Sequence, residues 1–109
     1  MKAGQAIDAL GALAQEHRLQ LFRLLVQAGA EGMAAGEIAR EIDIPNSSLS
    51  FHLGHLHRAG LIAQRRAGRS LIYSADYRAM DRLVAYLMEN CCGGARCSPI
   101  AVTQEKEIA

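Results

Sequence analysis

The amino-acid sequence predicts a mainly α fold of the α+β kind, in which five helices and one β-hairpin form a single domain. The length of 109 residues is that of one ordinary domain. Half of the residues are hydrophobic, only two are proline and none is tryptophan, which favours helices around a core of Leu, Ile, Val and Ala. The apolar residues recur at helical spacing except across residues 61–74, where they alternate.

Two amphipathic helices are expected at the start of the chain. The first covers residues 6–14, and its inward face is expected to be Ile7, Leu10, Leu13 and Ala14. The second carries apolar residues on several faces, so we expect it to be apolar over most of its circumference and to lie at the centre of the domain. Its apolar residues are Leu19, Leu21, Phe22, Leu24, Leu25, Val26 and Ala28.

A third and a fourth helix are expected on either side of a short turn. The third covers residues 35–42 and stops near Asp43. Asp43 tolerates a left-handed backbone, Pro45 cannot continue a helix, and Asn46 is a good N-cap for a fourth helix over residues 47–59. Two helices joined by so short a turn form a helix-turn-helix unit.

The exposed face of the fourth helix has an unusual composition. At 100° per residue, Leu49, Leu53 and Leu56 share one side. A solvated face would carry Glu and Lys, whereas the opposite side here offers hydroxyls, a glycine, an aromatic ring and a cation. Small residues allow a helix to enter a DNA major groove, and hydroxyls can bond bases or phosphates. This predicted DNA face consists of Ser47, Ser48, Phe51, Gly54, His55 and Arg58.

A β-hairpin is expected over residues 61–74, with its turn at Ala67-Gly68. Arg65, Arg66 and Arg69 lie at its tip, as in a wing that contacts phosphates or the minor groove. The net charge of +1 hides this concentration, because residues 46–82 carry +4 while residues 1–45 carry −2 and residues 83–109 carry −1. The alternatives are a solvated basic face and an edge hairpin whose charges prevent aggregation.

A last helix is expected to begin near Asp76, with a broad apolar stripe that includes Leu83 and Leu87. Nothing else in the domain is left to cover this stripe, so the first and last helices are expected to form a homodimer interface. We expect the domain to cover residues 1–97 and a mobile tail to cover residues 98–109. No stretch is apolar enough for a membrane span, and the first residues do not resemble an export signal, so a cytoplasmic protein is expected.

All three cysteines, Cys91, Cys92 and Cys97, fall within seven residues. Buried structural cysteines are the alternative, but a segment that contains Gly93-Gly94 is expected to be exposed. Three thiolates without a nitrogen partner favour a soft, thiophilic centre such as trivalent arsenic or antimony, whereas zinc prefers four ligands. Adjacent residues of a helix point about 100° apart, so convergence of Cys91 and Cys92 requires an unwound backbone, which the two glycines permit.

The chain resembles the ArsR/SmtB family of bacterial metal-responsive repressors. The resemblance covers about residues 6–90, and its matching phrases are residues 17–25, 36–39, 47–53, 56–62 and 68–73. It implies a winged helix-turn-helix homodimer that binds operator DNA, represses a metal-resistance operon and dissociates when an inducer binds. The DNA-binding residues expected from the face, the hairpin and the resemblance are Asn46, Ser47, Ser48, Ser50, Phe51, His52, His55, Arg58, Arg65, Arg66 and Arg69.

The usual ligand sites of the family are absent. The helix over residues 35–42 lacks the paired cysteines of the first arsenical repressors, and no histidine follows His57, unlike in the zinc sensors. At the end of the last helix, Cys91-Cys92 followed by a nearby cysteine resembles some arsenite-responsive members of the family. The resemblance implies release from DNA when As(III), or Sb(III), binds.

Three other functions are alternatives to arsenic sensing. A thiol redox switch, or a sensor of another soft metal, on the same DNA-binding body is the main alternative. His52, His55 and His57 are not expected to bind zinc, because they point in different directions and His57 falls towards the inner flank. An enzyme is not expected, since the chain lacks a Cys-x-x-Cys within a βαβ pattern and a phosphate-binding loop.

Overall fold

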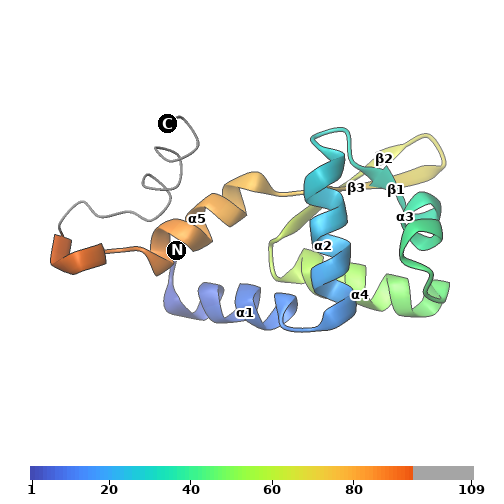
Figure 1. The fold of residues 1–109 in the computed structure, drawn as a ribbon. Coiled ribbons are helices and arrows are strands. Elements are labelled where there is room, and N and C mark those ends of the chain that lie inside the picture. Colours follow the sequence, from blue (N-terminus) through green and yellow to red (C-terminus); the bar gives the residue numbers. More distant parts are fainter. Residues whose placement is uncertain (95–109) are drawn as a thin grey trace, which may run out of the picture.

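The structure is a computed structural model that describes residues 1–94, and Figure 1 shows its arrangement. The five helices and the hairpin that the sequence predicts are present, which confirms the winged helix-turn-helix fold. Cys97 and the expected tail over residues 98–109 lie outside the described residues. The elements are α1 (Ala3–Leu13), α2 (Glu16–Ala28), β1 (Met33–Ala34), α3 (Ala35–Ile42), α4 (Asn46–Arg58), β2 (Ile62–Ala67), β3 (Ser70–Ala75), α5 (Tyr77–Leu87) and the short 3-10 turn η1 (Cys91–Gly94).

The hairpin belongs to a three-stranded antiparallel sheet with the order β1-β3-β2. The strand β1 is not predicted by the sequence pattern, because its two residues are too few to show alternation. Met33 pairs with Tyr73, directly after Gly32. Gly32 has a φ of +72°, and a Cβ atom there would collide with the backbone carbonyl oxygen of Tyr73. Only glycine therefore lets the chain turn into β1 this close to β3.

The α2 helix is central, as predicted, since it packs against α1, α3, α4 and β3. Its residues Leu21 and Leu25 are fully buried, and Phe22 is 3% exposed. The apolar residues of α2 are not all buried, because Leu19 and Val26 are 46% and 38% exposed. The neighbouring elements cover one side of α2 and leave these two side chains at the surface.

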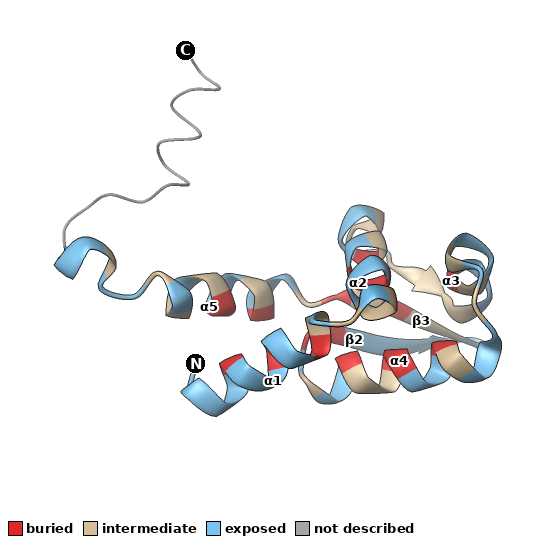
Figure 2. Cartoon of the chain, turned by 60° about the horizontal axis from the view of Figure 1, so that its bottom comes forward, coloured by how far each residue is buried: buried red, intermediate tan, exposed pale blue. Residues whose placement is uncertain are grey.

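The inward face of α1 differs from the prediction. Its buried residues are Ala6, Ala9 and Ala12, whereas Ile7 and Leu10 are 67% and 42% exposed. Alanine at every third position lets α1 lie close to its neighbours, so the larger side chains turn outwards. Figure 2 shows that the buried positions of α1 and α5 form stripes on these helices and leave the rest of each helix at the surface.

The ends of the helices follow the predicted signals with small shifts. Asp43 has the expected left-handed backbone, with φ 57° and ψ 55°. The N-cap of α4 is Pro45 rather than Asn46, which is the first residue of the helix. The last helix begins near Asp76 as expected, and Asp76 is its N-cap, because its carboxylate accepts a hydrogen bond of 3.1 Å from the backbone N–H of Ala79. None of the helices within residues 1–94 has the length and apolar character needed to cross a membrane.

Candidate nucleic-acid interface

The α4 helix presents a polar face on the side opposite its buried leucines. Leu49, Leu53 and Leu56 are buried, and the 3.6-residue repeat places Ser47 and Phe51 on the opposite side. The Phe51 ring is 59% exposed, which is costly for so large an apolar group unless it meets a partner. Of the other α4 residues predicted to bind DNA, Asn46, Ser50 and Arg58 are exposed, and Ser48 and His55 are half-buried.

The Arg58 side chain lies on the polar face of α4, next to Gly54, which has no side chain to displace it. A Cβ atom on Gly54 would lie 3.1 Å from the Nη1 atom of Arg58, so the guanidinium folds back along the helix towards the glycine. A guanidinium held on this face is placed to contact a phosphate. Glycine costs helix stability relative to alanine, and its place here is explained by the space that it leaves.

The wing brings the remaining predicted arginines together. Ala67 pairs with Ser70, so the two-residue turn is Gly68-Arg69, one residue later than predicted. Gly68 has a φ of 63°, the left-handed backbone that hairpin turns of this length favour. The Nη2 atom of Arg65 donates a hydrogen bond of 2.9 Å to the carbonyl oxygen of Glu31.

The other two arginines of the wing project from exposed positions. Arg66 and Arg69 are exposed, and their guanidinium groups make no hydrogen bond within residues 1–94. The wing therefore offers two unengaged cations near its tip, together with one that holds the hairpin against the loop before β1. This arrangement suits contact with a nucleic-acid backbone.

His52, which the resemblance adds to the residues expected to bind DNA, is buried on the inner side of α4. Its side chain is 8% exposed, and its Nδ1 atom lies 3.3 Å from Nη1 of Arg18. The helical repeat alone predicts that His52 faces the interior, because it lies about 60° from Leu49 and about 40° from Leu56 around the helix axis. His57, expected on the inner flank, is exposed instead, so the histidines of α4 do point in different directions.

The first two cysteines lie just beyond α5, in the turn η1. Asn90 and Cys92 have left-handed backbones, with φ angles of 57° and 54°, and Gly93 has a φ of 67°. The Sγ atoms of Cys91 and Cys92 are 3.7 Å apart. The sequence predicts a helix here that must unwind before the two thiols converge, whereas α5 has already ended at Leu87 and the two sulfur atoms already lie close together.

The geometry of the two sulfur atoms is that of a pair able to share one soft ion. Two thiolates of a tetrahedral zinc site, with bonds of about 2.3 Å, lie about 3.8 Å apart, close to the separation of Cys91 and Cys92. Cys91 is half-buried and Cys92 is exposed, and the Cys92 sulfur is disulfide-bonded in the structure, so one ion can bind both sulfurs only after reduction. Within residues 1–94 no three His, Cys, Asp or Glu side chains gather as a metal site, so a third sulfur ligand has to come from Cys97, outside these residues.

Comparisons with known proteins agree with the geometry of the helix-turn-helix and wing. The model of a helix-turn-helix domain family matches residues 13–65. The transcriptional regulator YgaV of Escherichia coli is 31% identical over 83% of this chain and 89% of its own length. ArsR of Halobacterium salinarum, whose name assigns it to an arsenical resistance operon, is 35% identical over 75% of this chain and 66% of its own length. This chain is a member of the ArsR/SmtB family.

The likeness in fold extends beyond the residues matched by the helix-turn-helix model. The structure of an ArsR-like transcriptional regulator from Rhodococcus superposes with a TM-score of 0.75 over 97% of this chain and 93% of that one. Its sequence identity of 21% makes this a likeness of fold. As an ArsR/SmtB protein, the chain is a DNA-binding transcriptional regulator, and its relatives are regulators rather than enzymes.

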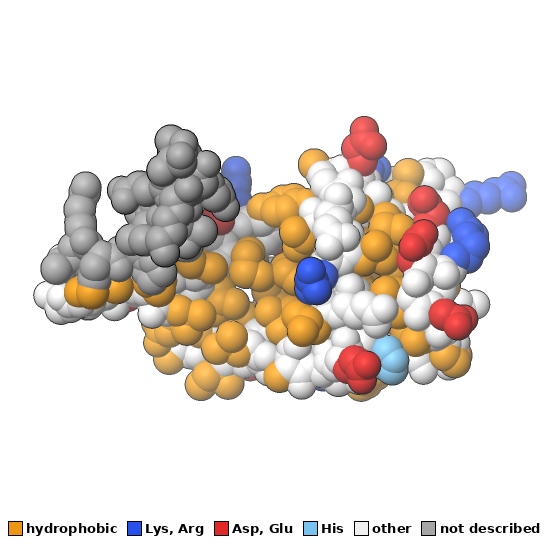
Figure 3. Space-filling model, viewed as in Figure 1, with side chains coloured by type: hydrophobic (Ala, Val, Ile, Leu, Met, Phe, Trp, Pro, Cys, Tyr) orange, Lys and Arg blue, Asp and Glu red, His pale blue; other side chains and the backbone are white. Residues whose placement is uncertain are grey.

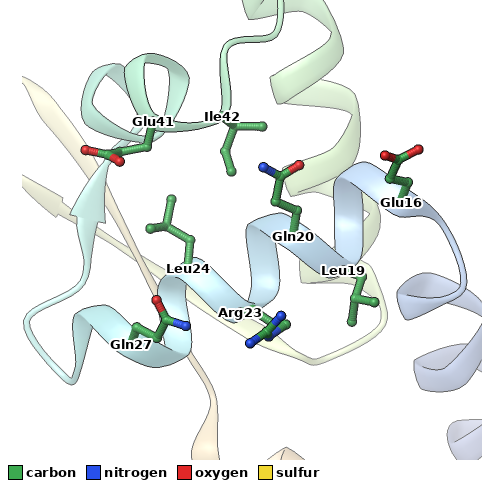
Figure 4. A pocket seen from close by; sticks show the side chains of 8 residues that line it. All are labelled: Glu16, Leu19, Gln20, Arg23, Leu24, Gln27, Glu41 and Ile42. Carbon is green, nitrogen blue, oxygen red and sulfur yellow. The ribbon is translucent and has the colours of Figure 1, made fainter.

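A separate groove of this ArsR/SmtB protein lies between α2 and α3. Figure 4 shows its lining, with Glu41 and Ile42 of α3 across from Leu24 and Gln20 of α2. Its volume is about 590 Å³. The lining contains neither the cysteines nor the predicted DNA-binding residues, so the groove is a seam between two packed helices beside the candidate interface.

Proposed function

We propose that this protein is a repressor that binds operator DNA as a homodimer and leaves it when trivalent arsenic, or antimony, is bound by three thiolates. The ligands are Cys91, Cys92 and Cys97. The single observation that carries the proposal is the 3.7 Å separation of the Cys91 and Cys92 Sγ atoms directly after the last helix. An all-sulfur set of this kind selects soft, thiophilic ions.

The DNA-binding part of the proposal relies on α4 and the wing. In this family the second helix of the helix-turn-helix unit enters the major groove, and here that helix carries hydroxyls, the exposed Phe51 ring and the Arg58 guanidinium on one face. Arg66 and Arg69 supply phosphate contacts from the wing. A homodimer doubles this surface and reads two half-sites of an operator.

The dimer interface is assigned to α1 and α5. Ile7, Leu10 and Leu87 are 67%, 42% and 55% exposed, and hydrophobic side chains gather over α1 and beside α5 in the view of Figure 3. Apolar surface of this kind is removed from water when two copies pack together. The α1 helix also packs against α4, so it connects the dimer interface to the recognition helix.

Ligand capture then changes operator affinity through these contacts. Binding of one ion by Cys91, Cys92 and Cys97 would constrain the segment that directly follows α5. Such a change at the dimerisation helix alters the spacing of the two recognition helices. A coupling of about 1–3 kcal/mol would lower operator affinity about 5- to 150-fold.

The test is release from operator DNA by arsenite under strict reduction. The single variants Cys91→Ser, Cys92→Ser and Cys97→Ser are each expected to bind the operator and to lose the response to arsenite. Glu89→Gln is the matched control, because this exposed neighbour bears no sulfur and is a candidate fourth ligand for zinc. Release of all three cysteine variants by arsenite would contradict the proposed site.

The main alternative is a redox switch, and the same pair of sulfur atoms favours it as the second candidate. Oxidation of two thiols to a disulfide requires close sulfur atoms and an oxidant, whereas arsenite acts on reduced thiols. Operator release by peroxide together with no response to arsenite under reduction would favour the redox switch. A transcription assay with purified polymerase decides whether the bound protein represses, since it is then expected to lower transcript yield.

A further inference from the structure

Arg18 connects three helices at the back of the recognition helix. It lies in the first turn of α2, where its backbone N–H donates to Oε1 of Gln15 at 2.9 Å. Its Nε atom donates to the carbonyl oxygen of Ala12 in α1 at 2.7 Å, and its Nη1 atom lies 3.3 Å from Nδ1 of His52 in α4. The Arg18 side chain therefore joins α1, one of the two helices proposed to form the dimer interface, to the middle of α4.

The contact between Arg18 and His52 requires a neutral imidazole. A guanidinium has only donors and keeps its charge in proteins. The Nδ1 atom of His52 must accept the hydrogen bond, so its proton resides on Nε2. Protonation of Nδ1 would set a donor against a donor and a cation against a cation, at a side chain that is only 8% exposed.

The other ionisable groups around His52 also disfavour its charged form. Burial lowers the pKa of His52 most, followed by the charges of Arg18, His17 and His55. Arg18 and His17 come from α2 and His55 from α4, while α1 contributes the Ala12 carbonyl that holds Arg18. Every ionisable group that shifts the pKa of His52 is basic, so none compensates a proton on its ring.

His52 also sets the surroundings of the exposed aromatic on the DNA face. The ring centroids of Phe51 and His52 are 5.4 Å apart in an edge-on arrangement, and those of Phe51 and His55 are 6.3 Å apart. A change in the position of His52 therefore changes the support of the Phe51 ring and the rotation of α4 about its axis. Neither Arg18 nor His52 needs to touch DNA to affect its recognition.

We propose that Arg18 and His52 form a proton-sensitive joint that holds α4 in its DNA-binding position, so that acidification weakens operator binding by breaking the contact between them. Both residues are positioning residues. The inference rests on DNA binding through α4, which is part of the proposed function, and is independent of the thiols. It goes beyond that function because it adds a second, proton-driven input to the same recognition helix.

The variant His52→Asn tests the joint in the full-length protein. The Oδ1 atom of asparagine occupies nearly the position of the histidine Nδ1 atom and accepts a hydrogen bond at every pH. Binding to a labelled duplex, selected from a random library at about pH 8, is measured at about pH 8 and about pH 5.5, on either side of the ordinary histidine pKa. His57→Asn is the control, because it removes an exposed histidine from the same helix.

The expected result is a difference between the wild type and His52→Asn in how their DNA affinity changes with pH. Every ionisable group other than residue 52 is the same in the wild type and in His52→Asn, so the comparison isolates His52. Over this pH range the wild type is expected to lose about fivefold or more in affinity relative to His52→Asn, the lower end of ordinary coupling between two sites. His57→Asn is expected to follow the wild type. Equal profiles for the wild type and His52→Asn would overturn the joint.

A second measurement tests the contact between Arg18 and His52 in the wild-type protein, without DNA. Nuclear magnetic resonance of the imidazole nitrogens of the wild type is expected to show His52 with its proton on Nε2 and with a pKa below 6.5. A proton on Nδ1, or an unshifted pKa, contradicts the proposal. Absence of DNA binding at about pH 8 contradicts the proposed function instead, and the magnetic resonance result still decides the joint.

Discussion

The hydroxyl of Tyr77, the first residue of α5, donates a hydrogen bond of 2.9 Å to the carbonyl oxygen of Val26 near the end of α2. The bond joins residues that are far apart in the sequence and fixes the start of α5 against the central helix α2. Farther along, α5 is held by Ala79 and Leu83, which are 4% and 3% exposed, and by its contact with α1. The angle at which α5 leaves the domain therefore depends on few interactions.

The substitution Tyr77→Phe is expected to lower the free energy of unfolding by about 0.5–1.5 kcal/mol, because it removes one hydrogen bond and keeps the ring. Urea denaturation measures the change. Tyr86→Phe is the control on the same helix, since the Tyr86 hydroxyl makes no hydrogen bond within residues 1–94. An effect of equal size in both variants would show that the bond to Val26 contributes nothing.

Replacement of Gly54 by alanine is expected to separate stability from DNA binding. The added methyl group raises the free energy of unfolding by about 0.5–1 kcal/mol through helix propensity. It also lies 3.1 Å from the Arg58 guanidinium, which has to shift by a few tenths of an ångström from its position on the DNA face, so affinity for the operator is expected to fall. Thermal unfolding and fluorescence anisotropy measure the two effects.

The control for this prediction is Gly11→Ala in α1. A Cβ atom there meets nothing within 4 Å, so the same gain in helix propensity comes without a displaced arginine. Gly11→Ala is expected to unfold at a higher temperature and to keep its DNA affinity. If Gly54→Ala also keeps its affinity, the Arg58 guanidinium is not part of the interface.

The stability of the protein is expected to rise with pH through the range in which histidine titrates. The pKa of His52 is lowered in the folded state relative to 6.5, so the unfolded chain binds more protons there and the free energy of unfolding increases with pH. This contribution of His52 is fully present above pH 6.5 and is lost as the pH falls through the lowered pKa. Urea denaturation across the range is expected to show a flatter curve for His52→Asn, and a curve as steep as that of the wild type would contradict the prediction.

The helix-turn-helix and hairpin could be predicted because local chemistry determines them. Pro45 and the left-handed Asp43 end one helix and begin the next, and the alternating residues after Gly60 form the hairpin at almost the predicted register. In contrast, the inward face of α1 depends on which residues its neighbours can accommodate. Ile7 fits the helical pattern as well as Ala6 does, and only the close packing of the tertiary structure decides between them.

The sequence predicts which side chains of α4 are exposed, but it does not predict which distant residues they contact. The exposed position of Phe51 follows from its angle around α4, and the angle of His52 also indicated the interior. The partner of His52 did not follow from the pattern, because Arg18 lies 34 residues earlier and nothing local relates the two. The approach of the Cys91 and Cys92 sulfur atoms likewise depends on where α5 ends, which the run of apolar residues up to Met88 obscured.

The proposed dimer interface is expected to be disrupted by a charge on α1 or α5. Ile7→Glu and Leu87→Glu place a carboxylate in the apolar surface that two copies would bury, where an unpaired charge is strongly unfavourable. Both variants are expected to remain folded, since both side chains are largely exposed in the single chain, and to sediment as monomers. Their operator affinity is expected to fall because a monomer reads one half-site. The control is Leu19→Glu, at a position 46% exposed on α2, which is expected to sediment with the same mass as the wild type. If Ile7→Glu and Leu87→Glu also sediment with the wild-type mass, the dimer interface lies elsewhere.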